Sequence, residues 1–367
     1  MRWNGPCSPS SSFSLVPARV AGPICHAAGP VDDTAVLPGS SRQRHSLFPE
    51  WSHRVFWMTW RQHRLTLASL AVVFLGLAGG YLLSGAAMRG SLSLEAVQKC
   101  FVGTPLTCPE WAGVISTDRN LRQTLLPVLP ALVGVFLGAP LVSRELEQRT
   151  FRYAWTQAIT PRHWLTSKVL LLGSAVTLLG AVFAAVYRWW FTPATTGAVT
   201  LYDWFDVFDQ GVLSFPSACL FAFALGVLAG TLTRRVVLGM GSALVGFLAV
   251  FLPLAIWVRP NYLPTLRVDA DSYYSQSGGW ATDFVYLDRD GNEFGMWEAL
   301  SRAGVTSTTS FGSEQEELLA RAGFREMVDY HPGDRFWVFQ LIEAGIFVAL
   351  AAGCVALTFW LVRRRSV

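Results

Sequence analysis

Six long runs of apolar residues organise the chain, with polar segments of very different lengths between them. Each run is near or above the roughly 17 to 25 residues that a helix needs to cross about 30 Å of hydrocarbon. Unpaired backbone groups are not tolerated in lipid, so the runs predict transmembrane helices. The runs are Leu65 to Leu83, Leu125 to Val142, Val169 to Val186, Val212 to Leu232, Val236 to Val258 and Phe336 to Val362.

The second run is expected to bend, because it contains three prolines. A proline inside a helix removes a backbone hydrogen bond and clashes with the preceding turn. The prolines are Pro127, Pro130 and Pro140.

The composition agrees with a membrane protein. Of the 367 residues, 52% are hydrophobic and only 15% are charged, and the mean hydropathy is +0.36. These values lie outside the usual soluble range. The net charge of +4 is modest, so it bears on membrane orientation and does not indicate nucleic-acid binding. The predicted fold class is an all-α integral membrane protein with six transmembrane helices.

Residues 143–168 form a short charged segment between the second and third runs. The spacing of Glu145 and Arg149 is typical of a short amphipathic helix at a membrane surface. Pro161 is expected to take the first position of the helix that leads into the third span. We therefore predict a structured elbow within the region of residues 65–258.

Basic residues cluster beside the spans on one side. With six spans, the elbow and all the other basic clusters face the same compartment, so both termini are predicted to be cytoplasmic in a plasma-membrane protein. Outside the elbow, these residues are Arg54, Arg61, Arg64, Arg234, Arg235, Arg363, Arg364 and Arg365.

Two segments precede the first span. Residues 1–50 are rich in Ser, Pro, Gly and Ala and are expected to be a disordered extension, unless translation starts nearer Trp51 or Met58. Residues 51–64 carry tryptophan and arginine anchors. We expect them to form an amphipathic helix in the membrane–water interface. They could equally be described as the basic flank of the first span, and the two interpretations are compatible.

Residues 259–335 form a long loop before the last span, residues 336–367, and are predicted to be extracytoplasmic. Acidic side chains outnumber basic ones in the loop, and aromatic residues are frequent. Residues 313–327 look helical. The loop is large enough for a small cap that could act as a lid, although a solvated aromatic-rich loop would have the same sequence character.

The six cysteines are scattered, without the spacing of a metal site, and we predict no metal. Cys100 and Cys108 lie close together in the first outer loop. Facing an oxidising compartment they could form a disulfide, or they could remain free thiols.

Polar and small residues inside the runs suggest helix contacts. Glu343, accompanied by Gln340, is the only carboxylate in the six runs, so it should face the protein interior, an aqueous path or the outer interface. Glycine pairs four residues apart let helices approach closely, although each pair alone is a weak signal. The pairs are Gly76 and Gly80, Gly134 and Gly138, and Gly226 and Gly230.

Three blocks of sequence are similar to a known family. They are Trp57 to Arg64, Gly138 to Gln157 and Tyr330 to Glu343. They resemble permease subunits of ABC transporters of the type-2 (ABC-2) exporter class, in the actinobacterial form. The resemblance covers about residues 51–367. It implies a cytoplasmic helix after the second span that docks on an ABC ATPase, and a homodimer or heterodimer of permeases with two ATPase subunits.

The resemblance also implies which residues couple to the ATPase. Arg149 stands where the family usually has glycine, and the loop before the last span is longer than in minimal members. The implied coupling residues are Arg144, Glu145, Glu147, Arg149, Thr150, Pro161 and Arg162.

No GxxxxGK[ST] motif occurs in the chain, so ATP is expected to bind to the partner ATPase, and no cofactor is predicted for this chain. A membrane-embedded enzyme would need convergent polar residues, and the spans offer a single carboxylate. A sensor or scaffold that uses residues 259–335 as its extracytoplasmic domain remains the alternative. Apolar spans do not encode the cargo.

Overall fold

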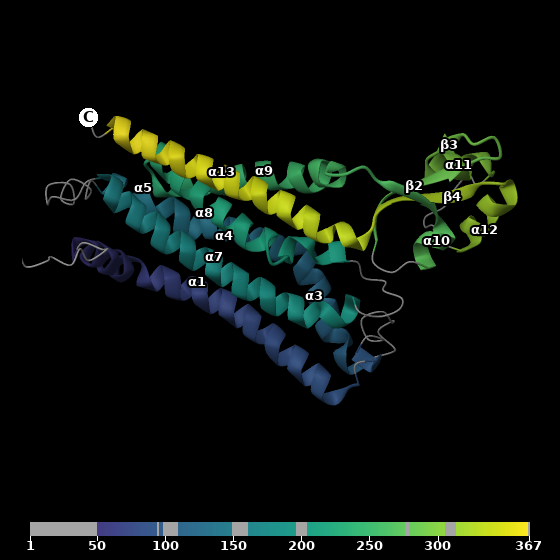
Figure 1. The fold of residues 1–367 in the computed structure, drawn as a ribbon, viewed down its shortest axis with the longest axis horizontal. Helices are drawn as coiled ribbons and strands as arrows, with labels where there is room; N and C mark the ends of the chain where they lie inside the picture. The colour runs from purple at the N-terminus through teal and green to yellow at the C-terminus, as the bar shows by residue number, and fades with distance from the viewer. Residues whose placement is uncertain are drawn as a thin grey trace, which may run out of the picture. The chain divides into compact units, whose positions relative to one another are not determined.

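Six helices long and apolar enough to cross a membrane lie within the part of the chain that the computed structural model describes (Figure 1). This confirms the predicted number of spans. They cover His63–Ser91, Pro109–Glu147, His163–Pro193, Ser214–Thr233, Val236–Asn261 and Gly333–Arg364. The described residues are 50–93, 95–97, 109–148, 161–195, 204–275, 279–304 and 313–365.

The first span belongs to one uninterrupted helix, α1 (Glu50–Ser91). The predicted boundary between an interfacial helix and the first span at residue 64 is therefore not a helix end. Residues 50–75 contain neither glycine nor proline, so nothing local stops the helix there.

The second span is irregular, as its prolines predict. It consists of α3 (Pro109–Thr124), a 3₁₀ turn η1 (Leu126–Val128), α4 (Leu129–Val133), a π-helical turn η2 (Gly134–Gly138) and α5 (Ala139–Glu147). Each of the three prolines lies near the start of a piece, at the first or second position of η1, α4 and α5, where a missing backbone N–H does the least harm.

The remaining spans are more regular. Helix α7 (Pro161–Thr195) begins at Pro161, as predicted, and a short 3₁₀ segment η3 (Trp204–Gln210) precedes α8 (Ser214–Thr233). Helix α9 (Val236–Pro253) continues through η4 (Leu254–Val258) and η5 (Arg259–Asn261), and α13 (Phe336–Arg365) ends the described chain.

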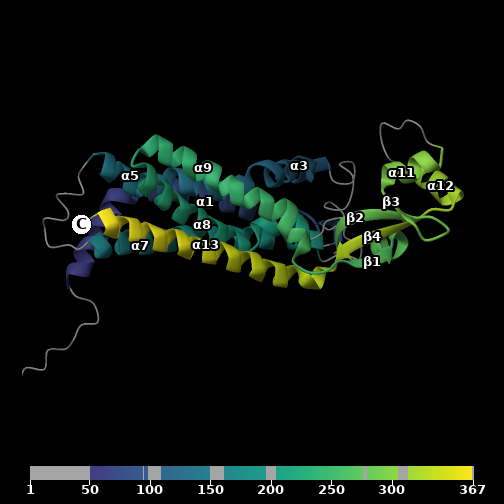
Figure 2. The same cartoon turned by 90° about the horizontal axis from the view of Figure 1, so that it is seen from above.

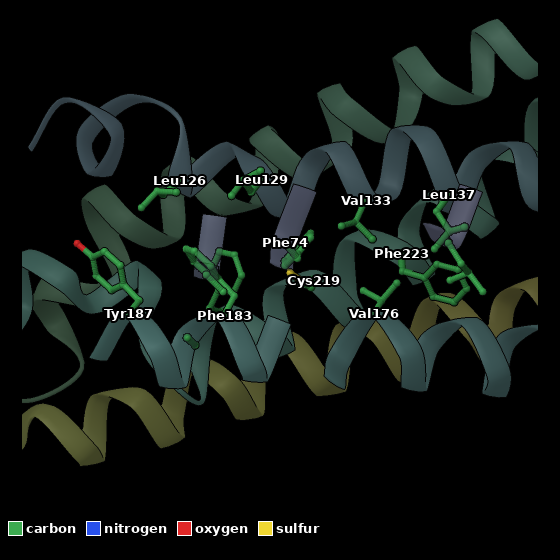
Figure 3. Packing of buried hydrophobic residues seen from close by; sticks show 14 of the residues in the cluster. Phe74, Leu126, Leu129, Val133, Leu137, Val176, Phe183, Tyr187, Cys219 and Phe223 are labelled. Atoms are coloured by element: carbon green, nitrogen blue, oxygen red, sulfur yellow. The ribbon is translucent and has the colours of Figure 1, made fainter. Parts of the chain in front are cut away.

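Helix α8 is the centre of the bundle. It packs against α5, α7, α9 and α13, as both views show, and it is buried along most of its length (Figures 1 and 2). Buried side chains join α8 to α1, α7 and the second span (Figure 3). Phe74 of α1 meets Phe183 of α7 edge to face, with ring centroids 6.2 Å apart, and Phe215 of α8 at 6.1 Å. In lipid such close packing, and not hydrophobic burial, holds helices together.

The long loop contains a four-stranded antiparallel sheet, which the all-α prediction did not include. Its order is β1-β4-β2-β3, formed by β1 (Leu266–Asp269), β2 (Trp280–Leu287), β3 (Glu293–Phe294) and β4 (Arg325–His331). Three helices, α10 (Ala270–Ser275), α11 (Met296–Arg302) and α12 (Ser313–Ala322), and a 3₁₀ turn η6 (Gly333–Arg335) accompany the sheet.

The loop has a small apolar core of its own, made by Tyr286, Ala299, Leu300 and Leu319. The prediction of a helix through residue 327 is wrong, because α12 ends at Ala322. Gly323 adopts a left-handed φ of 90°, which stops the helix, and β4 starts two residues later.

His331 links the sheet to the bundle. Its Nε2 lies 2.9 Å from the carbonyl oxygen of Pro260, and its Nδ1 lies 3.2 Å from Nη1 of Arg335. A carbonyl only accepts and a guanidinium only donates, so the neutral ring with its proton on Nε2 satisfies both contacts. Burial, and to a lesser extent the charge of Arg335, lower the pKa of His331 below its ordinary 6.5.

Acid should therefore weaken this link. Because the folded-state pKa of His331 is below the unfolded one, its stabilising effect is complete above about pH 6.5 and is lost as the pH falls further. We expect the melting temperature of the purified protein to fall more steeply from about pH 7.5 to about pH 5 than that of a His331→Gln variant. Parallel pH profiles for the two proteins would contradict this role.

Candidate functional site

The elbow predicted from sequence lies at the basic end of the bundle, where α5 ends and α7 begins, and where α13 also ends (Figure 1). Helix α5 is the continuation of the second span, so Arg144, Glu145 and Glu147 stand on the end of a membrane helix and not on a separate one. Arg149 and Thr150 lie outside the described residues. Pro161 and Arg162 start α7.

A buried ion pair joins the two ends of the elbow. The carboxylate of Glu145 accepts a hydrogen bond from the Nζ of Lys168, whose side chain is 1% exposed. The Lys168 ammonium also lies 4.5 Å from the ring centroid of Trp164. Removing one partner of such a pair leaves a buried charge, so Glu145 has a structural role inside the chain.

Glu147 reaches a different element. Its Oε2 accepts a hydrogen bond of 3.1 Å from the backbone N–H of Val236, the first residue of α9. A carboxylate at a helix N-terminus satisfies an orphan donor and is favoured by the helix dipole. Arg144 is exposed, as Glu147 is, but unlike the two glutamates it forms no bond to another element among the described residues. Of these three charged residues, Arg144 is therefore the one best placed to meet another protein.

Two of the three glycine pairs face each other. A Cβ added at Gly134 would lie 2.4 Å from the carbonyl oxygen of Ala222, and one added at Gly226 would lie 2.2 Å from that of Gly134. Gly138 and Gly230 are equally crowded by backbone. The second span and α8 are thus in backbone contact through the π-helical turn.

The third pair makes no such contact. A Cβ at Gly76 or Gly80 would meet no atom of the described residues within 4 Å, so among these residues the glycine pattern on α1 does not mark a helix contact.

At the opposite, sheet-bearing end of the bundle, Gln340 joins α13 to the start of α8. Its Oε1 accepts from the backbone N–H of Ser214 at 3.0 Å, and its Nε2 donates to the carbonyl oxygen of Phe208 at 2.8 Å. A Cβ at Gly211 would collide with the Gln340 amide, so the turn before α8 must be glycine for this contact.

Glu343, one turn further along α13, faces the protein interior. Arg259 binds its carboxylate with two hydrogen bonds of 2.8 Å, from Nε and from Nη2, and Nη2 also donates to Asp209 at 2.6 Å. The Tyr262 hydroxyl adds a bond of 3.3 Å. The Glu343 side chain is 1% exposed. Of the three environments that the sequence left open for Glu343, the structure places it in the protein interior, bonded to Arg259.

Sequence reasoning missed Arg259, because it was assigned to the outer loop. The fifth span continues through η5 to Asn261, so Arg259 belongs to the bundle. The loop therefore begins after residue 261 and not at residue 259 as predicted. Its position directly after an apolar run was the available signal, since an arginine there needs a partner.

A second buried carboxylate was also missed. Asp118 of α3 is 4% exposed and accepts hydrogen bonds of 3.0 Å from the hydroxyls of Tyr81 and Tyr187. Nε of Arg122 lies 3.9 Å from its other oxygen. This cluster ties α3 to α1 and α7.

Cys100 and Cys108 lie outside the described residues, so their pairing remains a prediction. Within the described ranges, no group of three or more His, Cys, Asp or Glu side chains could hold a metal ion.

The fold and its buried polar contacts define a multi-pass helical membrane protein. Residues 68–259, more than half of the chain, match the model of the ABC-2 membrane transporter related family. The chain belongs to this family and is a membrane transporter permease. Comparisons with curated proteins and with solved structures give no match.

Proposed function

We propose that this permease is driven by a separate ABC ATPase and exports its substrate from the cytoplasm, as a homodimer or heterodimer with two ATPase subunits. ATP binds to the partner and not to this chain. The observation that carries the proposal is the anchored elbow. An ion pair between Glu145 and Lys168 joins its two ends, and the second span, which leads into it, is in backbone contact with α8.

The basic end of the bundle is the cytoplasmic one in this proposal. Exposed arginines gather at the helix ends there, and cytoplasmic ends of membrane helices are enriched in Lys and Arg. Among the described side chains, these include Arg61, Arg64, Arg144, Arg234 and Arg364.

The same contacts suggest a route for the coupling. An ATPase that pushes the elbow moves α5. The glycine contacts transmit this movement to α8, because two backbones in direct contact cannot come closer together. Through Gln340, the other end of α8 is joined to α13. A conformational change of this kind requires contacts that differ between two states.

A sensor or scaffold is the second candidate. The loop of residues 259–335 supports it, because its sheet has an apolar core of its own and could serve as a receptor domain.

A pull-down separates the two candidates. The tagged permease is co-expressed with the ABC ATPase encoded nearest to it, in native form and as Arg144→Glu. We expect the ATPase to co-purify with the native chain and to be reduced about fivefold or more with the variant, the effect of losing roughly 1 kcal/mol of charge complementarity.

Arg364→Glu is the matched control, since it makes the same charge change at another exposed arginine of the basic end. It should retain the ATPase. Equal loss in both variants would argue against a specific contact at the elbow, and absence of any ATPase with the native chain would favour the sensor or scaffold. Glu145→Ala is unsuitable as a docking probe, because it removes the carboxylate that pairs with the buried ammonium group of Lys168.

A further inference from the structure

A groove runs between α1 and the second span at the basic end of the bundle. It consists of two adjoining hollows, of about 370 Å³ and about 230 Å³, that share Thr66, Phe136 and Leu137. Phe136 is 58% exposed, so the groove opens to the outside of the bundle and not into its centre.

The two hollows differ in chemistry. The larger one combines polar or charged side chains, among them His63, Arg144 and Gln148, with apolar ones such as Pro140 and Leu141. Apart from Thr66 and Ser69, the smaller one is lined by apolar side chains, including Leu70, Val73 and Leu132. The groove is therefore amphipathic along its length.

The charge at the polar end favours an anion. Glu145 is the single carboxylate among the described residues of the lining, and Lys168 already neutralises it. Arg144 is exposed, and Arg64 is exposed on α1 next to His63. His63 lines this hollow, and its buried Nε2 has no hydrogen-bond partner among the described residues.

The length of the whole groove fits one leaflet. Between Leu129 and Leu141 the second span rises by about 18 Å, at about 1.5 Å per residue, which is roughly half of a hydrocarbon core of about 30 Å. A single-leaflet amphiphile matches both the length and the polarity.

We propose that this groove binds an anionic phospholipid of the leaflet at the basic end. Its phosphate group lies at Arg144 and His63, and one acyl chain lies along Leu70, Val73 and Leu132. This site goes beyond the proposed function, since lipid binding needs neither the ATPase nor a substrate.

Native mass spectrometry of the purified full-length permease, without ATPase, tests the site. The protein is mixed with equal amounts of phosphatidylglycerol and phosphatidylcholine that carry the same acyl chains. We expect retained phosphatidylglycerol to exceed phosphatidylcholine about fivefold, the effect of one basic residue near a headgroup, and Arg144→Gln to abolish this preference.

Ser69→Trp fills the apolar hollow and should lower lipid retention about fivefold or more. Ser174→Trp is the matched control, because Ser174 is also exposed and also bonds its own helix backbone, but on α7 away from the groove. Val73→Trp serves as a second blocking variant if Ser69→Trp does not fold.

Three outcomes would overturn the proposal. Equal retention of the two lipids by the native protein would remove the headgroup site. Unchanged retention in the blocking variants would place the lipid elsewhere. A lipid-free dimer that dissociates on Ser69→Trp would make the groove an interface between two copies.

Discussion

Arg259→Met should lower the free energy of unfolding of the purified permease by about 3 to 5 kcal/mol, the usual effect of removing one partner of a buried ion pair. The change leaves the Glu343 carboxylate, 1% exposed, with the Tyr262 hydroxyl as its remaining hydrogen-bond donor among the described residues. Denaturation in detergent followed by tryptophan fluorescence measures the loss.

Two further variants make this test specific. Arg321→Met removes an exposed ion pair with Glu317 and should change stability by less than about 1 kcal/mol. Arg259→Met combined with Glu343→Leu removes both buried charges and should recover most of the loss, because Asp209 is 25% exposed and can be hydrated. If the double variant were as unstable as the single one, the pairing would not be the cause.

Gly226→Ala should destabilise the bundle, although alanine is the better helix former. Its added Cβ would lie 2.2 Å from the carbonyl oxygen of Gly134 and 2.9 Å from the backbone nitrogen of Ala139, so α8 and the second span must move apart. Overpacking of this kind costs about 1 to 3 kcal/mol. The thermal midpoint of the purified protein should fall accordingly.

Gly76→Ala is the matched control and should have the opposite sign. Its Cβ meets no atom within 4 Å, so only the higher helix propensity of alanine remains, worth up to about 1 kcal/mol. The proposed coupling route also requires Gly226→Ala to reduce substrate-linked ATPase activity when the complex is reconstituted. Equal effects of the two substitutions would show that the glycine contact has no special role.

The sequence predicted the spans well because a membrane helix is encoded locally. Length and apolarity alone define it, and each of the six runs overlaps one of the six candidate spans, although the fourth run begins two residues before Ser214. The helix start at Pro161 and the irregular second span followed from proline geometry, which is also local. The sheet in the outer loop did not follow, because its strands pair across long intervals, as Leu266 pairs with Tyr330.

The sequence also identified some residues of the candidate sites and missed others. The sequence identified the polar residues Gln340 and Glu343 and the charged end of α5, since polar groups stand out in apolar surroundings. It did not identify the partner of Glu343, because Arg259 lies 84 positions away and looked like part of a loop.

The sequence by itself determined six membrane helices, their irregular member and the resemblance to ABC-2 permeases. Only the tertiary structure decided which of the glycine pairs pack together, where Asp118 and Arg259 find their partners, and that Glu145 and Glu147 bond within the chain. The physical reason is that α8 is apolar all around and buried on most sides, so no periodic pattern in it indicates which helix each side contacts.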